Sequence, residues 1–360
     1  MQLLSKKTVA AAAAAGLGLA ALTGGVGASA STPDLHVQKT LSRAFVAPLQ
    51  FAVQGKWVYV ADSATSTLSV IGRSKPIARG PSPSANPVSS GDLAGVAVNG
   101  DDIAYTTTSA DHKDTRLTVL DPGHRPVVAH ISTFEKNYNP DHHNTYGLRH
   151  PGSVNQKCKA ELTASHIPVS YRGGLDSHAY SVAALKGEEW AVADAGANDI
   201  VKVDRRGHVS LIAVLPTQWV HVTKAVAAVV KAPDCVGATY GFEAVPTDVE
   251  VGPHGKLYVT TLPGGMGGQG SVYRVWRGGA HRIATGFAAA TNLAIGPHGR
   301  IYVAELGSGT ISTVWHGRPH RVASLPGVVA VEWANGHLYA STAPAVTGGK
   351  GPGTVVVLDD

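Results

Sequence analysis

The sequence predicts an all-β protein whose fold is a six-bladed β-propeller. The main observation is a unit that occurs six times, a short apolar strand followed by a tight turn and a second strand. Such a unit cannot bury both of its faces alone, so copies at a period of about 40 residues must pack against one another. High glycine and abundant Val, Thr and Tyr suit short strands and turns. The second strands are Trp57–Asp62, Ile103–Thr108, Trp190–Ala195, Leu257–Leu262, Ile301–Leu306 and Leu338–Ala343, and the turns before them carry Gly55, Gly100, Gly187, Gly255, Gly299 and Gly336.

The first thirty residues are predicted to be a secretory leader. Lys6 and Lys7 supply the positive start, residues 8–23 an apolar stretch, and residues 28–30 a small-residue cleavage site. We therefore expect cleavage near Ala30, a single mature domain over residues 31–360, and a secreted, extracellular protein. No later apolar stretch approaches about 18 residues, so no membrane span is predicted.

The repeats divide the mature chain into six blades. Five of them are expected to have four strands and the sixth only three. The β-compatible segment His36–Leu41 stands before the first blade, and we expect it to supply the missing strand and close the ring. The blades are expected at Leu49–Arg79, Gly95–Ile131, Ala179–Leu215, Asp248–Thr285, Asn292–Leu325 and Val329–Leu358.

The charge of the chain argues against nucleic acid as a partner. The formal net charge is +5, and removal of the two leader lysines leaves +3. No Arg-rich stripe or basic run with interleaved aromatic residues is present. The partner is therefore expected to be a small molecule or another protein.

The long connections all fall between strands two and three of a blade or between one blade and the next. In a propeller these connections open on one face, so one face is expected to be elaborated and the other plain. Two of them carry Cys158 and Cys235, and an even cysteine count in an exported chain favours a disulfide worth about 3–4 kcal/mol. Two unpaired buried thiols are the alternative. One small helix is expected near Thr223–Lys231, with Thr223 as its N-cap, either as a cap of the fold or as a binding element.

Polar residues stand at the starts of the inner strands, where they would ring the mouth of the central channel. Oxygen donors from several directions are what Ca²⁺ or Mg²⁺ requires, and Asp248 and Asn292 are the expected metal ligands. The alternative is that these side chains bond to neighbouring backbone groups. The candidate ligand-binding residues are His178, Thr247, Asp248, Glu250, Thr291, Asn292 and Glu332.

Three other motifs give weaker indications of a functional site. Asp141, His142 and His143 are adjacent in a polar loop, and adjacent residues seldom face one metal ion. The glycine-rich run 264–270 lacks the residues of a phosphate-binding loop and is expected to be a loop only. Asp62, Asp194 and Glu305 recur after the second strand and are expected to fix the local turn.

Five segments resemble the bacterial ScyD/ScyE family, whose genes lie beside those for scytonemin pigment biosynthesis. The resemblance also includes Asn139–Asp141, Tyr146–Gly147 and both cysteines, and it covers nearly all of the mature chain. It implies an exported propeller of the NHL and lactonase-like kind, and no particular reaction. The short loop Leu262–Gly270 departs from the family pattern. The segments are Leu175–Ala183, Val192–Asp204, Val245–Gly265, Thr285–Leu306 and Leu338–Thr342.

Two classes of function fit these observations. The first is a non-enzymatic exported binding or scaffold protein that uses the elaborated face around the channel. The second is a metal-dependent lactonase-like or lyase-like enzyme that polarises a carbonyl at the channel mouth. The sequence favours the first class because no complete catalytic set is present, and the fold alone does not choose between them.

Overall fold

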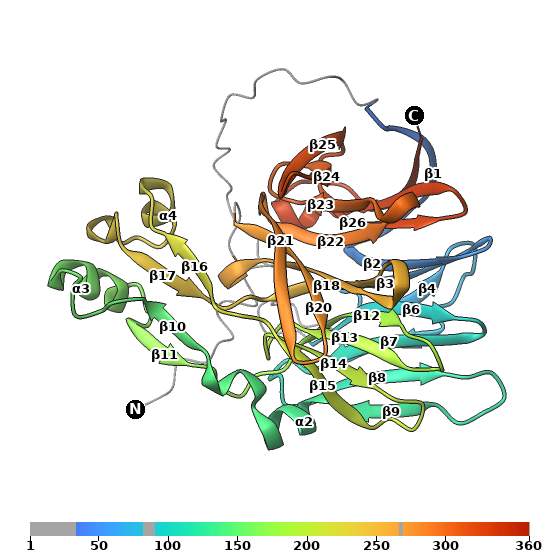
Figure 1. Ribbon diagram of the computed structural model, residues 1–360. Helices are drawn as coiled ribbons and strands as arrows, with labels where there is room; N and C mark the ends of the chain where they lie inside the picture. Colours follow the sequence, from blue (N-terminus) through green and yellow to red (C-terminus); the bar gives the residue numbers. More distant parts are fainter. Residues whose placement is uncertain (1–33, 82–90, 266–268, 360) are drawn as a thin grey trace.

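The computed structural model describes residues 34–81, 91–265 and 269–359. The predicted leader, residues 1–30, and the centre of the connection 80–92 therefore lie outside the described residues. Most of the described chain forms strands (Figure 1), and the strands pair antiparallel into four-stranded sheets.

Five of the sheets are simple meanders, in which each strand pairs with the next strand along the chain. Each runs from a first strand in the molecular interior to a fourth strand at the outside. The five sheets are β2 to β5 (Pro48–Gln54, Trp57–Asp62, Thr67–Val70, Ala78–Arg79), β6 to β9 (Asp92–Asn99, Asp102–Thr108, Thr115–Leu120, Val127–His130), β12 to β15 (Ala179–Ala184, Trp190–Asp194, Asp199–Val203, Val209–Val214), β18 to β21 (Pro246–Val251, Leu257–Thr261, Gly270–Trp276, Gly279–Phe287) and β22 to β25 (Ala290–Ile295, Ile301–Glu305, Thr310–Trp315, Arg318–Ser324).

The sixth sheet joins the two ends of the chain. It consists of β26 (Val328–Ala334), β27 (His337–Thr342) and β28 (Gly353–Asp359), followed by β1 (His36–Phe45). β1 pairs antiparallel with β28 from His36 opposite Asp359 to Phe45 opposite Gly353. The spare strand predicted at His36–Leu41 thus pairs with the last strand, and it is four residues longer than expected.

The first strands of these six sheets contact one another in chain order. β2 contacts β6, β6 contacts β12, and the series continues through β18, β22 and β26 back to β2. Each first strand also has a register shift against its second strand near its beginning, as between Pro246 and Asp248 in β18. The chain is therefore an all-β protein with a β-propeller-like arrangement.

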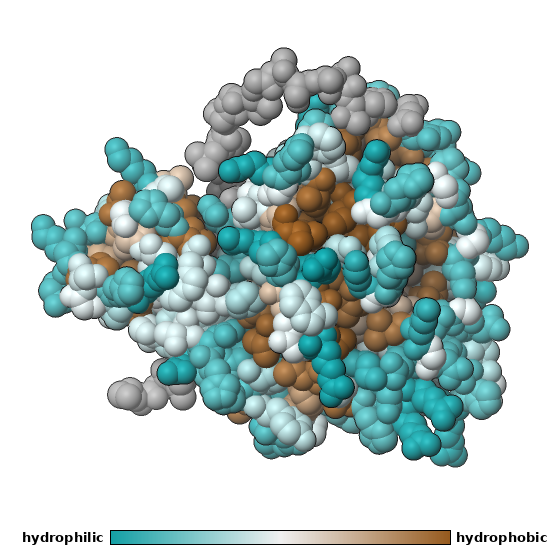
Figure 2. Space-filling view, viewed as in Figure 1, coloured by the Kyte–Doolittle hydropathy of each residue, from teal (hydrophilic) through white to brown (hydrophobic). Residues whose placement is uncertain are grey.

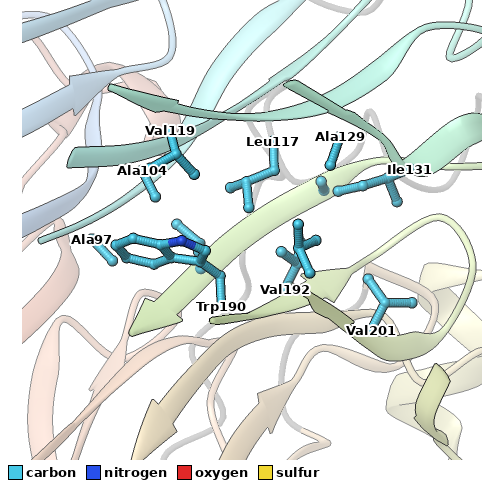
Figure 3. Packing of buried hydrophobic residues seen from close by; sticks show 12 residues of the cluster. Ala97, Ala104, Leu117, Val119, Ala129, Ile131, Trp190, Val192 and Val201 are labelled. Carbon is cyan, nitrogen blue, oxygen red and sulfur yellow. The ribbon is translucent and has the colours of Figure 1, made fainter. Parts of the chain in front are cut away.

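The hydrophobic core lies between the faces of neighbouring sheets. In the cluster between β6–β9 and β12–β15, the buried Trp190 ring lies beside Ala97 and Ala104, while Leu117 faces Val192 (Figure 3). Small residues on one face against large residues on the next allow twisted sheets to pack closely. This packing explains why both faces of β13 and β23 are buried throughout.

A seventh sheet, absent from the sequence prediction, is formed by two long connections. β10 (Thr145–Leu148) and β11 (Ser170–Arg172) come from the first connection, and β16 (Gln218–His221) and β17 (Thr239–Phe242) come from the second. With α3 (Gln156–Ala164) and α4 (Lys224–Val229) they form a lobe that projects beyond the six sheets, at the left of Figures 1 and 2. The predicted disulfide joins Cys158 to Cys235 inside this lobe, so the alternative of two free thiols is wrong.

The helices differ in part from the expectation of one small helix. α4 (Lys224–Val229) lies inside the predicted segment, and the Thr223 side chain accepts a hydrogen bond from the Val226 N–H, as predicted for its N-cap. α2 (Ile131–Tyr138) and α3 (Gln156–Ala164) were not predicted. α2 has no side-chain N-cap, and the hydrophobic residues of α3 are few, so neither helix carries a strong sequence signal. Within the described ranges, no helix is long and apolar enough to cross a membrane.

Candidate functional site

Two of the predicted site residues, Thr247 and Thr291, hold neighbouring first strands together. Thr247 in β18 donates to the Ala290 carbonyl of β22 at 3.0 Å, and Thr291 in β22 donates to the Val329 carbonyl of β26 at 2.7 Å. Both side chains are buried. Each hydroxyl sits at the register shift of its strand and there bonds to a carbonyl of the next first strand.

The residues that follow, Asp248 and Asn292, repeat this arrangement with acceptor groups. Asp248 Oδ2 accepts the Leu293 N–H at 2.8 Å and Asn292 Oδ1 accepts the Val331 N–H at 2.7 Å. The Ser181 hydroxyl, at the equivalent point of β12, donates to Asp248 Oδ1. The sequence left open the alternative that these side chains bond to neighbouring backbone groups. The structure shows such hydrogen bonds for both Asp248 and Asn292.

Gln50 of β2 completes this ring, and the sequence analysis missed it. Asn292 Nδ2 donates to Gln50 Oε1 at 2.8 Å, and Gln50 Nε2 donates to the Thr247 carbonyl at 3.2 Å. The amide therefore links strands from sheets that are far apart in the sequence. Gln50 follows the register shift of β2 as Asp248 and Asn292 follow theirs, so the three positions are equivalent in the structure, but a register shift is not visible in the sequence.

Glu250 and Glu332 lie two residues further along β18 and β26. Burial and the Glu332 carboxylate raise the pKa of Glu250 well above its ordinary value. Burial and Asp248 raise the pKa of Glu332 to about 8, and burial raises the pKa of Asp248 to about 7. The three carboxyl groups are thus close enough to oppose one another's ionisation.

The predicted metal ligands already have protein partners. Both carboxylate oxygens of Asp248 and the amide oxygen of Asn292 accept hydrogen bonds. In the part of the chain that the structure describes, no group of three or more His, Cys, Asp or Glu side chains is arranged to hold a metal ion. A cation here would take its oxygen donors chiefly from Glu250 and Glu332, so the fit of Asp248 and Asn292 to a Ca²⁺ or Mg²⁺ site is poor.

His178 lies apart from this ring, at the start of β12, in a cluster of two His–Asp pairs that we call the mouth cluster. His178 Nε2 lies 3.1 Å from Asp92 Oδ2, and His112 Nδ1 lies 2.8 Å from Asp176 Oδ1. The two imidazole rings are 5.0 Å apart. The Ser63 hydroxyl also donates to Asp92, so three sheets contribute to the cluster.

The mouth cluster is largely but not fully buried. The His178 and Asp92 side chains are 14% and 16% exposed. Burial lowers the pKa of His178, but the carboxylates of Asp92, Asp194 and Asp176 together outweigh burial and raise that pKa to about 9. His178 is therefore an imidazolium at neutral pH, and it presents N–H donors rather than a free basic nitrogen.

Three acidic residues outside these clusters have the turn-fixing role that was expected. Asp62 accepts the N–H groups of Val46, Ala47 and Thr65. Asp194 accepts those of His178, Gly196 and Ala197, and Glu305 accepts that of Ala288. Each carboxylate ties the end of a second strand to the chain before the first strand.

The adjacent residues Asp141, His142 and His143 do not form one site. Asp141 is buried and accepts hydrogen bonds from Tyr146 and Asn198 at 3.0 and 2.9 Å, whereas both histidines are exposed. The polar loop therefore divides between a structural carboxylate and two surface imidazoles.

Comparison with known proteins gives a fold and no family. No family model matches the chain, and no curated protein matches it. Among solved structures, it is similar to the PQQ-bound aldose sugar dehydrogenase of Streptomyces coelicolor, with a TM-score of 0.58 and 13% identity over 92% of this chain and 99% of that one. It is also similar to a glucose dehydrogenase, with a TM-score of 0.51 and 12% identity over 89% of this chain and 99% of that one. A putative gluconolactonase has a TM-score of 0.50 and 11% identity over 91% of this chain and 94% of that one. At such low identity the likeness shows the β-propeller fold alone.

Proposed function

We propose that the six sheets are the blades of a six-bladed β-propeller whose ring is closed by β1, and that the chain is a member of the ScyD/ScyE family. The cyclic order of contacts among the first strands, with β26 against β2, supports the blade number. The pairing of β1 with β28 supports the closure, because it covers the edge that β28 would otherwise expose. The segments quoted above support the family.

The proposed function is that of a non-enzymatic exported binding protein. It holds a small polar molecule, or a polar group of a partner, on the face that carries the lobe. The mouth cluster is the proposed centre of this site. Export is supported by the disulfide, which is typical of oxidising compartments, and by the leader that the sequence predicts.

The observation that carries this proposal is the His178–Asp92 pair. A histidine held as a cation at neutral pH is a poor proton acceptor, but it is a strong hydrogen-bond donor to a carbonyl or carboxylate oxygen. His112 lies beside it with its own carboxylate at 2.8 Å. Two imidazoles, each oriented by its own carboxylate, suit recognition of an oxygen-rich ligand.

A thermal-shift screen with aldoses, aldonolactones and small carboxylates tests this function. We expect at least one of these probes to stabilise the wild-type protein, and we expect His178→Asn and His112→Asn to lose that stabilisation. His208→Asn is the matched control, because His208 also pairs with an aspartate but is exposed in the β14–β15 turn. Equal binding by all three variants would show that the mouth cluster is not part of the binding site.

One observation favours the second candidate, a Ca²⁺- or Mg²⁺-dependent lactonase-like or lyase-like enzyme. Besides burial, the Glu332 and Asp248 carboxylates raise the pKa of Glu250, and the Asp248 carboxylate raises that of Glu332, and a bound cation would relieve that repulsion. Metal analysis of the purified protein, with Asp248→Ala, Asn292→Ala and Glu332→Gln, distinguishes the two functions. Stoichiometric metal that is lost in these variants would favour the enzyme, and a metal-free protein that still binds a probe would favour the binding protein.

A further inference from the structure

Two neighbouring sheets carry the same basic and aromatic hairpin on the face opposite the mouth cluster. The β20–β21 hairpin reads VWRGGAHRIA over residues 275–284, and the β24–β25 hairpin reads VWHGRPHRVA over residues 314–323. Trp276 lies opposite Gly279 and Trp315 opposite Arg318, each at the last pair before the turn. These tryptophans are 48% and 63% exposed, which is unusual for the largest apolar side chain.

The first turns of the same two sheets lie beside these hairpins. In a four-stranded antiparallel meander, the turn between strands one and two and the turn between strands three and four are at the same end. The β18–β19 turn contributes Lys256 and the β22–β23 turn contributes Arg300, both exposed. The two turns contact each other, because a Cβ built on Gly299 would lie 3.2 Å from Pro253 Cγ. We call the exposed residues of these four turns the basic face.

The charge of this segment is strongly one-sided. Residues 251–331 contain seven Lys or Arg residues and a single acidic residue, Glu305, which is 4% exposed. The rest of the chain therefore has no net positive charge, and the modest total conceals the asymmetry. The seven cationic residues are Lys256, Arg274, Arg277, Arg282, Arg300, Arg318 and Arg321.

Few of these cations are neutralised within the protein. Arg321 lies 3.2 Å from Asp34, and Arg282 hydrogen-bonds Tyr273. Across residues 34–81, 91–265 and 269–359, no carboxylate forms an ion pair with the other five. Arg274 lies over the Trp276 ring at 5.9 Å, which keeps a cation and an indole together at the surface.

On the side of β12–β15, the basic face meets turns of mixed charge. In the β14–β15 turn, the exposed Arg205 and Arg206 stand beside Asp204, which pairs with His208 at 3.1 Å. In the β8–β9 turn, His124 pairs with Asp121. These two turns present both signs of charge and no tryptophan. In the first sheet, the β2–β3 and β4–β5 turns place Lys56 and Arg73 at 5.0 and 5.1 Å from the centre of the exposed Trp57 ring, so this end of the molecule carries a second group of cations around a tryptophan.

We propose that the basic face docks the protein on an anionic phospholipid surface. Tryptophan is favoured at the membrane–water interface, where its ring is half in the apolar layer and its N–H is among the headgroups. Trp276 and Trp315 occupy equivalent positions on adjacent sheets, so both reach the same depth. The surrounding Lys and Arg side chains bind the phosphate groups, and their attraction falls off within about 10 Å at moderate salt. The lobe and mouth cluster then face away from the lipid.

Vesicle sedimentation tests the proposal. The full mature chain is mixed with vesicles of phosphatidylcholine alone or of phosphatidylcholine with phosphatidylglycerol. We expect binding only to the anionic vesicles, weakening as salt is raised, with a blue shift of tryptophan emission. Trp276→Ala/Trp315→Ala should abolish the shift, and Arg277→Gln/Arg318→Gln should weaken binding about thirtyfold. Arg205→Gln/Arg206→Gln, which removes equal charge from the β14–β15 turn, should bind as the wild type does.

The controls separate lipid from other polyanions. Equal binding to neutral vesicles, or equal loss in the Arg205/Arg206 control, would overturn the proposal. Binding to soluble polyphosphate or to an anionic polysaccharide, with vesicles left unbound, would assign the face to a soluble polymer and also overturn it. Each variant is first shown to melt as the wild type does, and if the tryptophan pair unfolds, the arginine pair decides the outcome.

Discussion

Asp199 begins β14 opposite Asp194, and the two carboxyl groups differ in their hydrogen bonding. Asp194 accepts several hydrogen bonds, whereas neither oxygen of Asp199 has a hydrogen-bond partner in the described structure and the residue is 1% exposed. Burial and the Asp194 carboxylate raise the pKa of Asp199 well above its ordinary value. The corresponding residue is threonine in several other sheets, such as Thr67, Thr115 and Thr310.

We expect Asp199→Thr to stabilise the protein by about 1–3 kcal/mol, because it removes an unsatisfied buried polar group. The gain should grow with pH, since a folded-state pKa above the unfolded value makes the carboxyl increasingly destabilising as pH rises. Urea unfolding at several pH values measures this effect. Asp194→Thr is the contrast, and it should destabilise; a loss of stability in both variants would mean that Asp199 has a partner of its own.

Glu332 provides a separate test of the raised pKa values of Asp248, Glu250 and Glu332. Its folded-state pKa of about 8 exceeds the unfolded value of 4.5, so its contribution to stability falls as pH rises between those values. We expect Glu332→Gln to flatten the decline of the melting temperature from about pH 5 to about pH 8. Glu189→Gln, which removes a surface partner of Lys202, should leave the decline unchanged. An equally steep decline in Glu332→Gln would contradict the raised pKa.

Individual site residues could be predicted from the sequence only in part. A repeat brings equivalent positions together around one axis, and the starts of the inner strands are joined by hydrogen bonds from Leu293 to Asp248 and from Val331 to Asn292. The sequence could not show which of these side chains bond to the next strand, since that depends on the register shifts. Asp92 and His112 complete the mouth cluster with His178 and Asp176. Asp92 begins β6, whereas His112 comes from the β7–β8 connection, whose path follows no repeat.

At the scale of elements, the strands of the six sheets were predictable and the lobe was not. Alternating apolar residues and glycine turns gave most strands to within two residues. β10, β11, β16 and β17 have three or four residues each, and they pair across distant parts of the chain, as Gly147 does with Gly241. Strands this short have no periodicity to recognise, and their pairing is set by the disulfide and the small core around it.

The disulfide should stabilise the lobe and not the six sheets. We expect Cys158→Ser/Cys235→Ser to lower the stability of the lobe by about 3–4 kcal/mol, because the bridge closes a loop between two connections. Hydrogen exchange measures this effect by element. The amides of β16 and β17 should lose protection, while those of β13 and β23 keep it. Uniform loss of protection across both sets would show that the lobe and the sheets unfold as one unit.

At the scale of the whole molecule, the two ends of the propeller-like body differ in kind. One end carries long connections, the lobe and the mouth cluster, and the other carries short turns and the basic face. The sequence predicted this division from connection lengths. It did not predict the charge asymmetry, because the acidic residues of other sheets offset the basic ones in the total. Two binding surfaces on opposite ends would let a protein held at one surface take a ligand at the other.

The proposed fold is a closed ring of sheets in which β1, at the beginning of the chain, completes the last sheet. The most direct measurement compares the melting of a chain that begins at Ser31 with that of a chain that begins at Val46 and so lacks β1. Without β1, the edge of β28 is exposed and Leu41 and Phe45 leave the core. We predict a melting temperature lower by about 10 °C or more, together with aggregation. Identical, reversible melting of the two chains would contradict the closed ring.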